Sequence, residues 1–416
     1  MRKGIMFSFI MVFITLSVLA LIAIQNSLVT QRREQIFVET RINSMNNMYE
    51  SMIKDIDKSL QIISRRAVSV AFSNVSVSEA GIPPQPLDEA NETLTELILN
   101  GTLEGTSEPL MENATFIYWI DRIKELSILK GFDMDVCINS LEVKPYDYLH
   151  LLVKTEMDIN ISDKQGVAEI NRSVQVNSIV SLEGLEDPLY PLYTNGLGSN
   201  IIRRSPYIGN YTQLLMVGNG GDGYDYGTIT TDTFNFDGKI LLAENVSKYL
   251  EGGNAIGAIS EEEIVVSISI PYIVNSSALS LLQEGMNVLL DGSGNQVWFI
   301  DNLIEHTEYS YYHPSENGPS YLDRLEGEFV KQDKYESPAN KTIGMESFVN
   351  KIDLSSIPGI SVNEGKTNID YIYFSSSSAP SKKVKGLDKL DPNPYFKIDN
   401  QDEHEKIYNV TGLVTS

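Results

Sequence analysis

An uninterrupted apolar run from Ile5 to Ile24 constrains this chain more than any other feature of its sequence. The run carries no charge, and as a helix it would extend about 30 Å, the thickness of the hydrocarbon core of a bilayer. It exceeds the roughly 7–15 apolar residues of a secretory signal, and no A-x-A cleavage site follows it. The sequence therefore predicts a membrane-spanning helix over residues 5–24.

The helix is expected to continue beyond the membrane. No Gly or Pro follows the apolar run before Gly81 and Pro83, and apolar residues recur at spacings of three and four up to Val70. This pattern predicts one long amphipathic helix, so that residues 1–70 comprise a leader, the spanning segment and its extension. The apolar stripe would pack either on the chain's own globular part or on identical helices in a filament. Its members are Tyr49, Met52, Ile56, Leu60, Ile63, Ala67 and Val70.

Charge and composition bound the partners of the remaining chain. The formal net charge of −24 would repel phosphates, which argues against a nucleic-acid partner and suits a soluble, exposed surface. The single cysteine, Cys137, excludes an intramolecular disulfide and is expected to be buried in a strand.

N-x-S/T sequons are the second informative feature, because all eleven lie beyond the apolar run. Basic residues flank the run on both sides and do not decide its orientation. The acidic, sequon-bearing region after the run favours a single-pass protein with a cytoplasmic N-terminus and a glycosylated extracellular bulk. The predicted glycosylation sites are Asn74, Asn91, Asn100, Asn113, Asn160, Asn171, Asn210, Asn245, Asn275, Asn340 and Asn409.

The chain after the long helix is predicted to have α+β architecture. Residues 71–110 form a Pro-rich neck with a short helix that ends at Gly101, and residues 111–184 form a small domain in which a helix packs on an antiparallel sheet. The helix is expected at 114–130, and the strands at Met134–Val143, Tyr148–Ser162 and about 174–182.

Residues 185–416 are richer in Gly, Pro and Tyr and are predicted to form a larger, mostly-β extracellular domain. The expected elements are strands at Thr228–Asn235, Ile264–Val274, Val288–Leu290, Val297–Leu303 and Ile369–Phe374, and a helix near Ala278–Glu284.

No catalytic or metal-binding motif is found. The Gly-rich stretch 218–227 lacks the Lys-Ser/Thr pair of a P-loop, and the DGSGN turn at 291–295 lacks the rest of a calcium loop. HExxH and GxSxG patterns are absent from the sequence. We therefore predict no cofactor, no metal and no enzyme activity. The EYSYYHP segment at 308–314 indicates either a sugar- or protein-binding face or a Tyr-rich strand edge.

The N-terminus resembles a known family. The basic leader MRKG runs directly into the apolar helix, which is similar to the class III signal of type IV pilins and archaeal pilin-like proteins. The resemblance implies cleavage between Gly4 and Ile5 and other pilin-like subunits as partners. Bacterial pilins usually carry Glu at the fifth mature position, where this chain has Phe9.

Four later segments are similar to those of archaeal membrane-anchored surface proteins, and they bring no catalytic residues with them. They are GLEDPLY at 184–190, GPSYLDRLEG at 318–327, GMESFVN at 344–350 and NIDYIYFS at 368–375.

Three functions follow as expectations. The first is a pilin-like surface protein with a structural or adhesive role in the archaeal envelope, such as a minor filament subunit. The second is a membrane-tethered ectodomain that recognises a glycan, an envelope protein or a solute. The third is an envelope hydrolase whose carboxylates are paired only in space.

Overall fold

The computed structural model describes residues 2–76, 83–206, 240–243, 258–259, 272–275, 300–336, 341–376, 380–384, 396–399, 404–408, 410 and 414–415. Long helices precede a run of long strands, and short helices and strands follow, which confirms the predicted α+β class. The chain divides into two compact units. We call Met1–Ser64, Glu96–Glu142 and Val153–Ser178 the helix-and-sheet unit, and Arg65–Thr95, Val143–Leu152 and Ile179–Ser416 the C-terminal unit.

Helix α1 (Arg2–Ser76) has two halves of opposite character. Its first half exposes apolar side chains, and Phe13 and Leu21 are 69% and 66% exposed. By length and composition, α1 can cross a membrane, and the described residues contain no second helix of this kind. Its second half buries the whole predicted stripe from Tyr49 to Val70. The sequence left open whether that stripe packs on the chain itself, and its burial shows that it does.

The helix-and-sheet unit contains a three-stranded sheet of order β3-β4-β5, with β3 at Phe132–Asp147, β4 at His150–Asp163 and β5 at Glu169–Ser181. Two residues join β3 to β4, a connection that only an antiparallel hairpin allows. Every second residue of β4 from Leu151 to Ile161 is buried, as the period-two pattern predicts.

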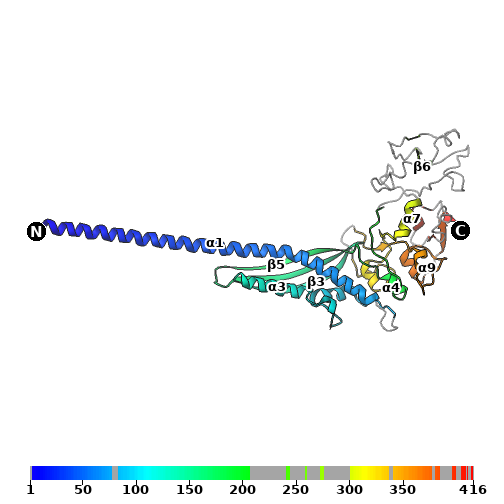
Figure 1. Cartoon of the computed structure of the whole chain (residues 1–416), viewed down its shortest axis with the longest axis horizontal. Coiled ribbons are helices and arrows are strands. Elements are labelled where there is room, and N and C mark those ends of the chain that lie inside the picture. Colours follow the sequence, from blue (N-terminus) through cyan, green and yellow to red (C-terminus); the bar gives the residue numbers. More distant parts are fainter. Residues whose placement is uncertain are drawn as a thin grey trace. The chain divides into compact units, whose positions relative to one another are not determined.

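Helices cover the buried face of this sheet (Figure 1). Met52 and Ile56 of α1, Ile120 of α3 (Phe116–Leu129) and Met157 and Ile159 of β4 line one apolar crevice. The pairing of helix and sheet thus follows from matching an apolar helix stripe to an apolar sheet face.

Glycines end the two shorter helices of this region where the sequence predicts. Helix α2 (Ala90–Asn100) stops at Gly101, whose φ is +71°, and Gly131 follows α3 with a φ of +81°. Both residues adopt the left-handed conformation that only glycine takes without cost. Two very short strands, β1 (Thr102–Leu103) and β2 (Thr106–Ser107), and the 3-10 helix η1 (Pro109–Met111) connect α2 to α3.

The described residues of the C-terminal unit beyond Ser181 alternate short helices and short strands, so the predicted mostly-β character is met only in part. The helices are α4 (Leu189–Tyr193), α7 (Ile300–Tyr309), α8 (Tyr321–Leu325), α9 (Lys351–Ser356), α10 (Asp370–Phe374) and α11 (His404–Ile407). The strands are β6 (Ile240–Ala243), β7 (Ala258–Ile259), β8 (Tyr272–Asn275), β9 (His313–Pro314), β10 (Met345–Glu346), β11 (Ser381–Val384), β12 (Lys397–Asp399) and β13 (Val414–Thr415).

Two predicted strands and one predicted burial are wrong. Residues 370–374 form helix α10, and Ile300–Leu303 begin helix α7. Four consecutive residues of α10 are buried, so no period distinguishes it from a strand in the sequence. Cys137 is exposed rather than buried, because it occupies one of the outward positions of β3.

Other predictions fall on residues outside the described ranges. These are the strands at Thr228–Asn235 and Val288–Leu290, most of Ile264–Val274, the helix near Ala278–Glu284 and the loops at 218–227 and 291–295.

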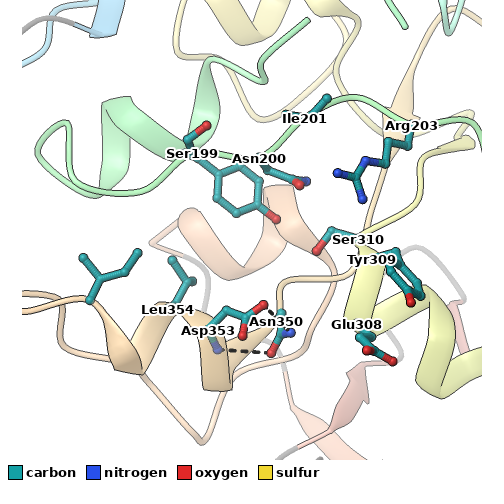
Figure 2. A pocket seen from close by; sticks show the side chains of 12 residues that line it. Ser199, Asn200, Ile201, Arg203, Glu308, Tyr309, Ser310, Asn350, Asp353 and Leu354 are labelled. Atoms are coloured by element: carbon teal, nitrogen blue, oxygen red, sulfur yellow. Dashed lines mark hydrogen bonds between the residues drawn. The ribbon is translucent and has the colours of Figure 1, made fainter. Parts of the chain in front are cut away.

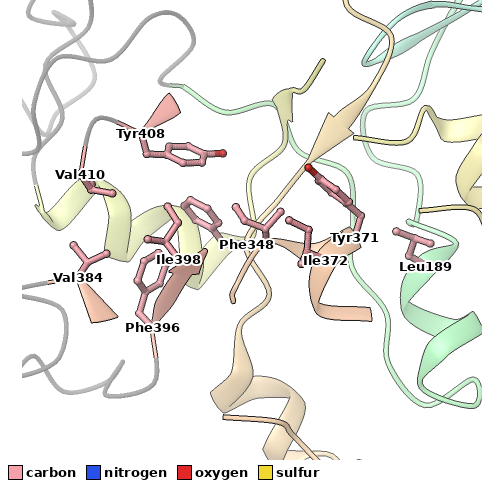
Figure 3. Packing of buried hydrophobic residues seen from close by; sticks show 10 residues of the cluster. Leu189, Phe348, Tyr371, Ile372, Val384, Phe396, Ile398, Tyr408 and Val410 are labelled. Atoms are coloured by element: carbon pink, nitrogen blue, oxygen red, sulfur yellow. The ribbon is translucent and has the colours of Figure 1, made fainter. Parts of the chain in front are cut away.

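The apolar core of the C-terminal unit is rich in aromatic rings (Figure 3). Phe348 lies at its centre, 5.4 Å from the ring of Phe396 and 5.1 Å from that of Tyr408. The other fully enclosed members of the core are Leu189, Ile369, Tyr371, Ile372, Val384, Ile398 and Val410.

Candidate functional site

A buried ion cluster around Arg324 is the most polar feature of the C-terminal unit. Arg324 Nη1 contacts the Asp187 carboxylate and lies 2.8 Å from Asp370 Oδ2, and all three side chains are fully buried. Arg324 Nη2 donates to the carbonyl oxygen of Met345 at 2.5 Å. A buried guanidinium is tolerated only when it is paired in this way.

Further hydrogen bonds hold both carboxylates of the Arg324 cluster. Tyr312 Oη donates to Asp187 Oδ2 at 2.7 Å, and Ser347 Oγ donates to Asp370 Oδ2 at 3.0 Å. Burial raises the pKa of Asp370, and the negative charge of Asp187 adds to this effect, although Arg324 opposes it. Two carboxylates therefore compete for one guanidinium in a region without solvent.

Four segments that are far apart in the sequence meet in this cluster. Asp187 lies in segment 184–190, Arg324 in 318–327, Ser347 in 344–350 and Asp370 in 368–375. The sequence gives no sign that these segments are neighbours. Their shared role is structural, because each supplies a group that another needs in order to be buried.

A second buried ionic group consists of His404 and the carboxylates of Glu346 and Asp399. His404 Nε2 lies 3.2 Å from Glu346 Oε2, and its Nδ1 lies 3.3 Å from Asp399 Oδ1. Burial lowers the pKa of His404, but the two carboxylates outweigh burial and raise it to about 11. Burial likewise raises the pKa of Glu346, yet His404 brings it down to about 2. At neutral pH, His404 and Glu346 therefore form a charged pair. Tyr408 Oη donates a hydrogen bond to the other carboxylate oxygen of Glu346, Oε1.

A third polar group consists of Ser205, His306 and His313. Ser205 Oγ lies 3.1 Å from His306 Nε2, and His306 Nδ1 lies 2.8 Å from His313 Nε2. Burial lowers the pKa of His313 to about 4, and burial together with His313 lowers the pKa of His306 well below its usual value. Both rings are therefore neutral at neutral pH, and the order of the groups is that of a nucleophile, a base and an orienting partner.

A cavity of about 340 Å³ lies at the surface of the C-terminal unit, between segments 199–203, 308–310 and 350–357 (Figure 2). Its volume falls at the lower end of the range of roughly 300–1,000 Å³ for small-molecule sites. Ser205, His306 and His313 are not among its lining residues, and Ser205 is only 1% exposed. The cavity therefore gives no substrate access to that serine.

The cavity is lined by polar groups of both signs. Figure 2 shows the Arg203 guanidinium, the Asn200 amide and the Ser310 hydroxyl around one space, with Asn350 and Asp353 across it. Glu308 and the 43%-exposed ring of Tyr309 complete the wall near the end of α7. Such a lining offers hydrogen-bond donors and acceptors on opposite sides of a ligand.

Local structure fixes two parts of the cavity wall. Asn350 is the N-cap of α9: its Oδ1 accepts from the backbone N–H of Ile352 and Asp353 at 3.1 and 3.2 Å, and its Nδ2 donates to Asp353 Oδ2 at 2.7 Å. Ser310 follows the last residue of α7 with a φ of +47°, a conformation that costs a non-glycine residue roughly 1–2 kcal/mol.

The Arg324 cluster reaches the cavity through Asn200. Asn200 Nδ2 donates to Tyr312 Oη at 2.8 Å, and Tyr312 Oη donates in turn to Asp187 beside Arg324. This chain of donors leaves the Asn200 Oδ1 as the atom available to the cavity. A rigid buried network therefore orients a side chain of the cavity wall.

The sequence-predicted processing residues, Gly4 and Ile5, both lie near the start of α1. Among the predicted glycosylation sites, Asn74, Asn100, Asn113 and Asn171 are exposed. Asn91 and Asn160 are half-buried, and their side-chain oxygens are enclosed. Asn275 ends β8, and Asn210, Asn245, Asn340 and Asn409 lie outside the described residues.

Sequence reasoning missed Arg203, Asn200, Asn350 and Asp353, because none belongs to a motif. It did single out the EYSYYHP segment, whose side chains divide between two environments. Tyr309 lines the cavity, whereas Tyr312 and His313 are buried in the polar networks. Of the two interpretations, a binding face or a strand edge, the position of Tyr309 fits the first and the His313–Pro314 strand fits the second.

Comparison of this chain with protein-family models, with curated proteins and with solved structures finds no match.

Proposed function

We propose that this chain is a membrane-anchored, pilin-like surface protein with a structural or adhesive role in an archaeal envelope or filament, and that it acts without catalysis. The observation that carries the proposal is the division of α1. Its first half exposes an apolar surface long enough for a bilayer, and its second half buries its apolar stripe within the same chain. The N-terminus lies in the cytoplasm and the bulk lies outside.

The proposal includes processing and partners. Cleavage between Gly4 and Ile5 exposes the apolar start of α1, and other pilin-like subunits or envelope proteins then pack on the mature protein. Glycans occupy the exposed sequons Asn74, Asn100, Asn113 and Asn171, while Asn91 and Asn160 stay unmodified because their side chains are partly enclosed. Intact-mass and peptide analysis of protein from the native cell distinguishes these two groups.

The test combines cell fractionation with N-terminal sequencing of the native protein. We expect the polypeptide in sheared filaments or membranes, with Ile5 as its first residue. Changing Gly4→Val should leave Met1 in place and abolish filament recovery. Recovery of the intact chain as a soluble cytosolic protein would overturn the proposal.

A second candidate function is a binding ectodomain that stays in the membrane. The cavity beside Arg203 and Asn350 favours it, because polar groups of both signs converge there at the protein surface. A mature protein that retains its leader and remains in membranes, rather than in filaments, would favour this candidate over the first.

A further inference from the structure

We propose that the cavity lined by Arg203, Asn200, Glu308, Tyr309 and Asp353 binds one or two rings of a neutral carbohydrate. The inference rests on the surface location proposed above and names the ligand class of the adhesive or binding role. The argument depends on hydrogen-bonding groups that the protein leaves unused, on the charge of the lining and on the rigidity of the wall.

The first observation is unused hydrogen-bonding capacity. Arg203 and Glu308 are exposed at the cavity and form no ion pair or hydrogen bond through their side chains with the described residues. Asp353 Oδ2 accepts a hydrogen bond from Asn350 Nδ2, which leaves Oδ1 as the second acceptor of this carboxylate. A guanidinium donor and carboxylate acceptors that line one cavity suit a ligand whose groups both accept and donate, and a hydroxyl does both.

Tyr190 forms another part of the cavity wall. Its side chain lines the cavity and is 4% exposed. Its hydroxyl is enclosed beside Ser347 and close to the charges of Asp187 and Asp370, so it belongs to the buried Arg324 cluster. Tyr190 therefore contributes a fixed, enclosed ring to the cavity wall rather than a hydroxyl for the ligand.

The charge of the lining selects against ionic ligands. One guanidinium, that of Arg203, faces two carboxylates, those of Glu308 and Asp353, and the whole chain carries −24. An anionic ligand would meet both carboxylates and the negative field, and a cationic ligand would meet Arg203. A neutral ligand with many hydroxyls satisfies all three side chains. The exposed Tyr309 ring offers the apolar face against which the C–H surface of a sugar ring packs.

The wall is held in place before any ligand arrives. Asn200 is oriented through Tyr312 by the buried Arg324 cluster, and Asn350 is fixed as the N-cap of α9. Ser310, directly after α7, has a left-handed backbone conformation. Unusual conformations of this kind are concentrated at binding sites. A preorganised wall lowers the ordering cost of binding.

The experiment uses the full chain in detergent micelles and saturation-transfer NMR. The probes are methyl glycosides of glucose, galactose, mannose and N-acetylglucosamine and their disaccharides, with N-acetylneuraminic acid and L-glutamate as ionic comparisons. We expect transfer to at least one neutral saccharide and a weaker signal from both ionic probes. Arg203→Met should lower the affinity at least tenfold, and so should Glu308→Gln.

Arg204→Met is the matched control, because Arg204 is the adjacent residue but pairs with Glu183 at 2.9 Å and does not line the cavity. The control should bind like the unchanged protein. The proposal is overturned if no neutral saccharide shows transfer, if only an ionic probe binds, or if Arg203→Met and Arg204→Met weaken binding equally. Because binding in micelles is independent of export and processing, its failure is distinct from failure of the proposed cellular location.

Discussion

Strand β4 in the helix-and-sheet unit buries Val153, Met157 and Ile159 at alternate positions, whereas the C-terminal unit buries Arg324 between Asp187 and Asp370. The first core is stabilised mainly by removing apolar surface from water. The second combines an aromatic cluster with charges that are tolerated only as complete sets. The free energy of unfolding of the two units should therefore respond differently to the removal of one side chain.

The largest effect is expected from Arg324→Met, which leaves Asp187 and Asp370 buried without a counter-charge. We expect a loss of about 3–5 kcal/mol in the free energy of unfolding of the C-terminal unit, toward the upper end because two carboxylates lose one partner. Hydrogen exchange of the full chain in micelles, read by mass spectrometry, assigns the loss to one unit. Arg204→Met, which breaks only an exposed pair, should cost about 0–1 kcal/mol.

His404→Gln should destabilise the C-terminal unit by an amount that depends on pH. The pKa of His404 is raised from 6.5 to about 11, so its protonated form stabilises the fold fully below pH 6.5 and less as the pH rises toward 11. The pKa of Glu346 is lowered from 4.5 to about 2, so its contribution is present above pH 4.5 and is lost toward pH 2.

The unchanged protein should therefore exceed His404→Gln in stability by the most between about pH 4.5 and 6.5. Because the substitution breaks a buried charged pair, the difference in the free energy of unfolding should reach about 3 kcal/mol or more in this pH range. Urea unfolding of both proteins from pH 3 to pH 10 measures the difference. A gap that stays constant up to pH 10 would contradict a charged His404.

Leu60→Ala tests the apolar core of the helix-and-sheet unit, since Leu60 is fully buried in α1. The lost transfer free energy and the cavity left behind should together cost about 2–5 kcal/mol, independently of pH. Ile62→Ala, two residues away on the same helix, removes a side chain that is 72% exposed and should cost less than about 0.5 kcal/mol. Equal losses in urea unfolding would contradict the observed stripe.

The smallest effect is a gain from Ser310→Gly. Relief of the left-handed conformation is worth roughly 1–2 kcal/mol, and the greater freedom of unfolded glycine removes roughly 0.5–1 kcal/mol. The net stabilisation should be about 0.5–1 kcal/mol in thermal or urea unfolding. Asn195→Gly at a φ of +55° should gain less, because asparagine tolerates this region.

Sequence patterns predicted the first part of the fold better than the second. The period of α1 and of β4 is set by residues within each element, and one side of each element is buried. Helix α10 could not be predicted in this way, because four consecutive residues are buried and leave no period: Asp370, Tyr371, Ile372 and Tyr373. The candidate site could not be predicted, since Arg203, Asn200 and Asp353 are unremarkable polar residues until the chain brings them together.

The sequence alone determined that this chain has a helix able to span a bilayer, a stripe that continues it and a helix followed by paired strands, because these features depend on neighbours a few residues apart. Tertiary structure alone decided which charges are buried and what they support. Arg324 pairs with Asp187 and Asp370, which are 137 and 46 residues away in the sequence. A charge can be buried only where the fold brings such distant partners into contact with it.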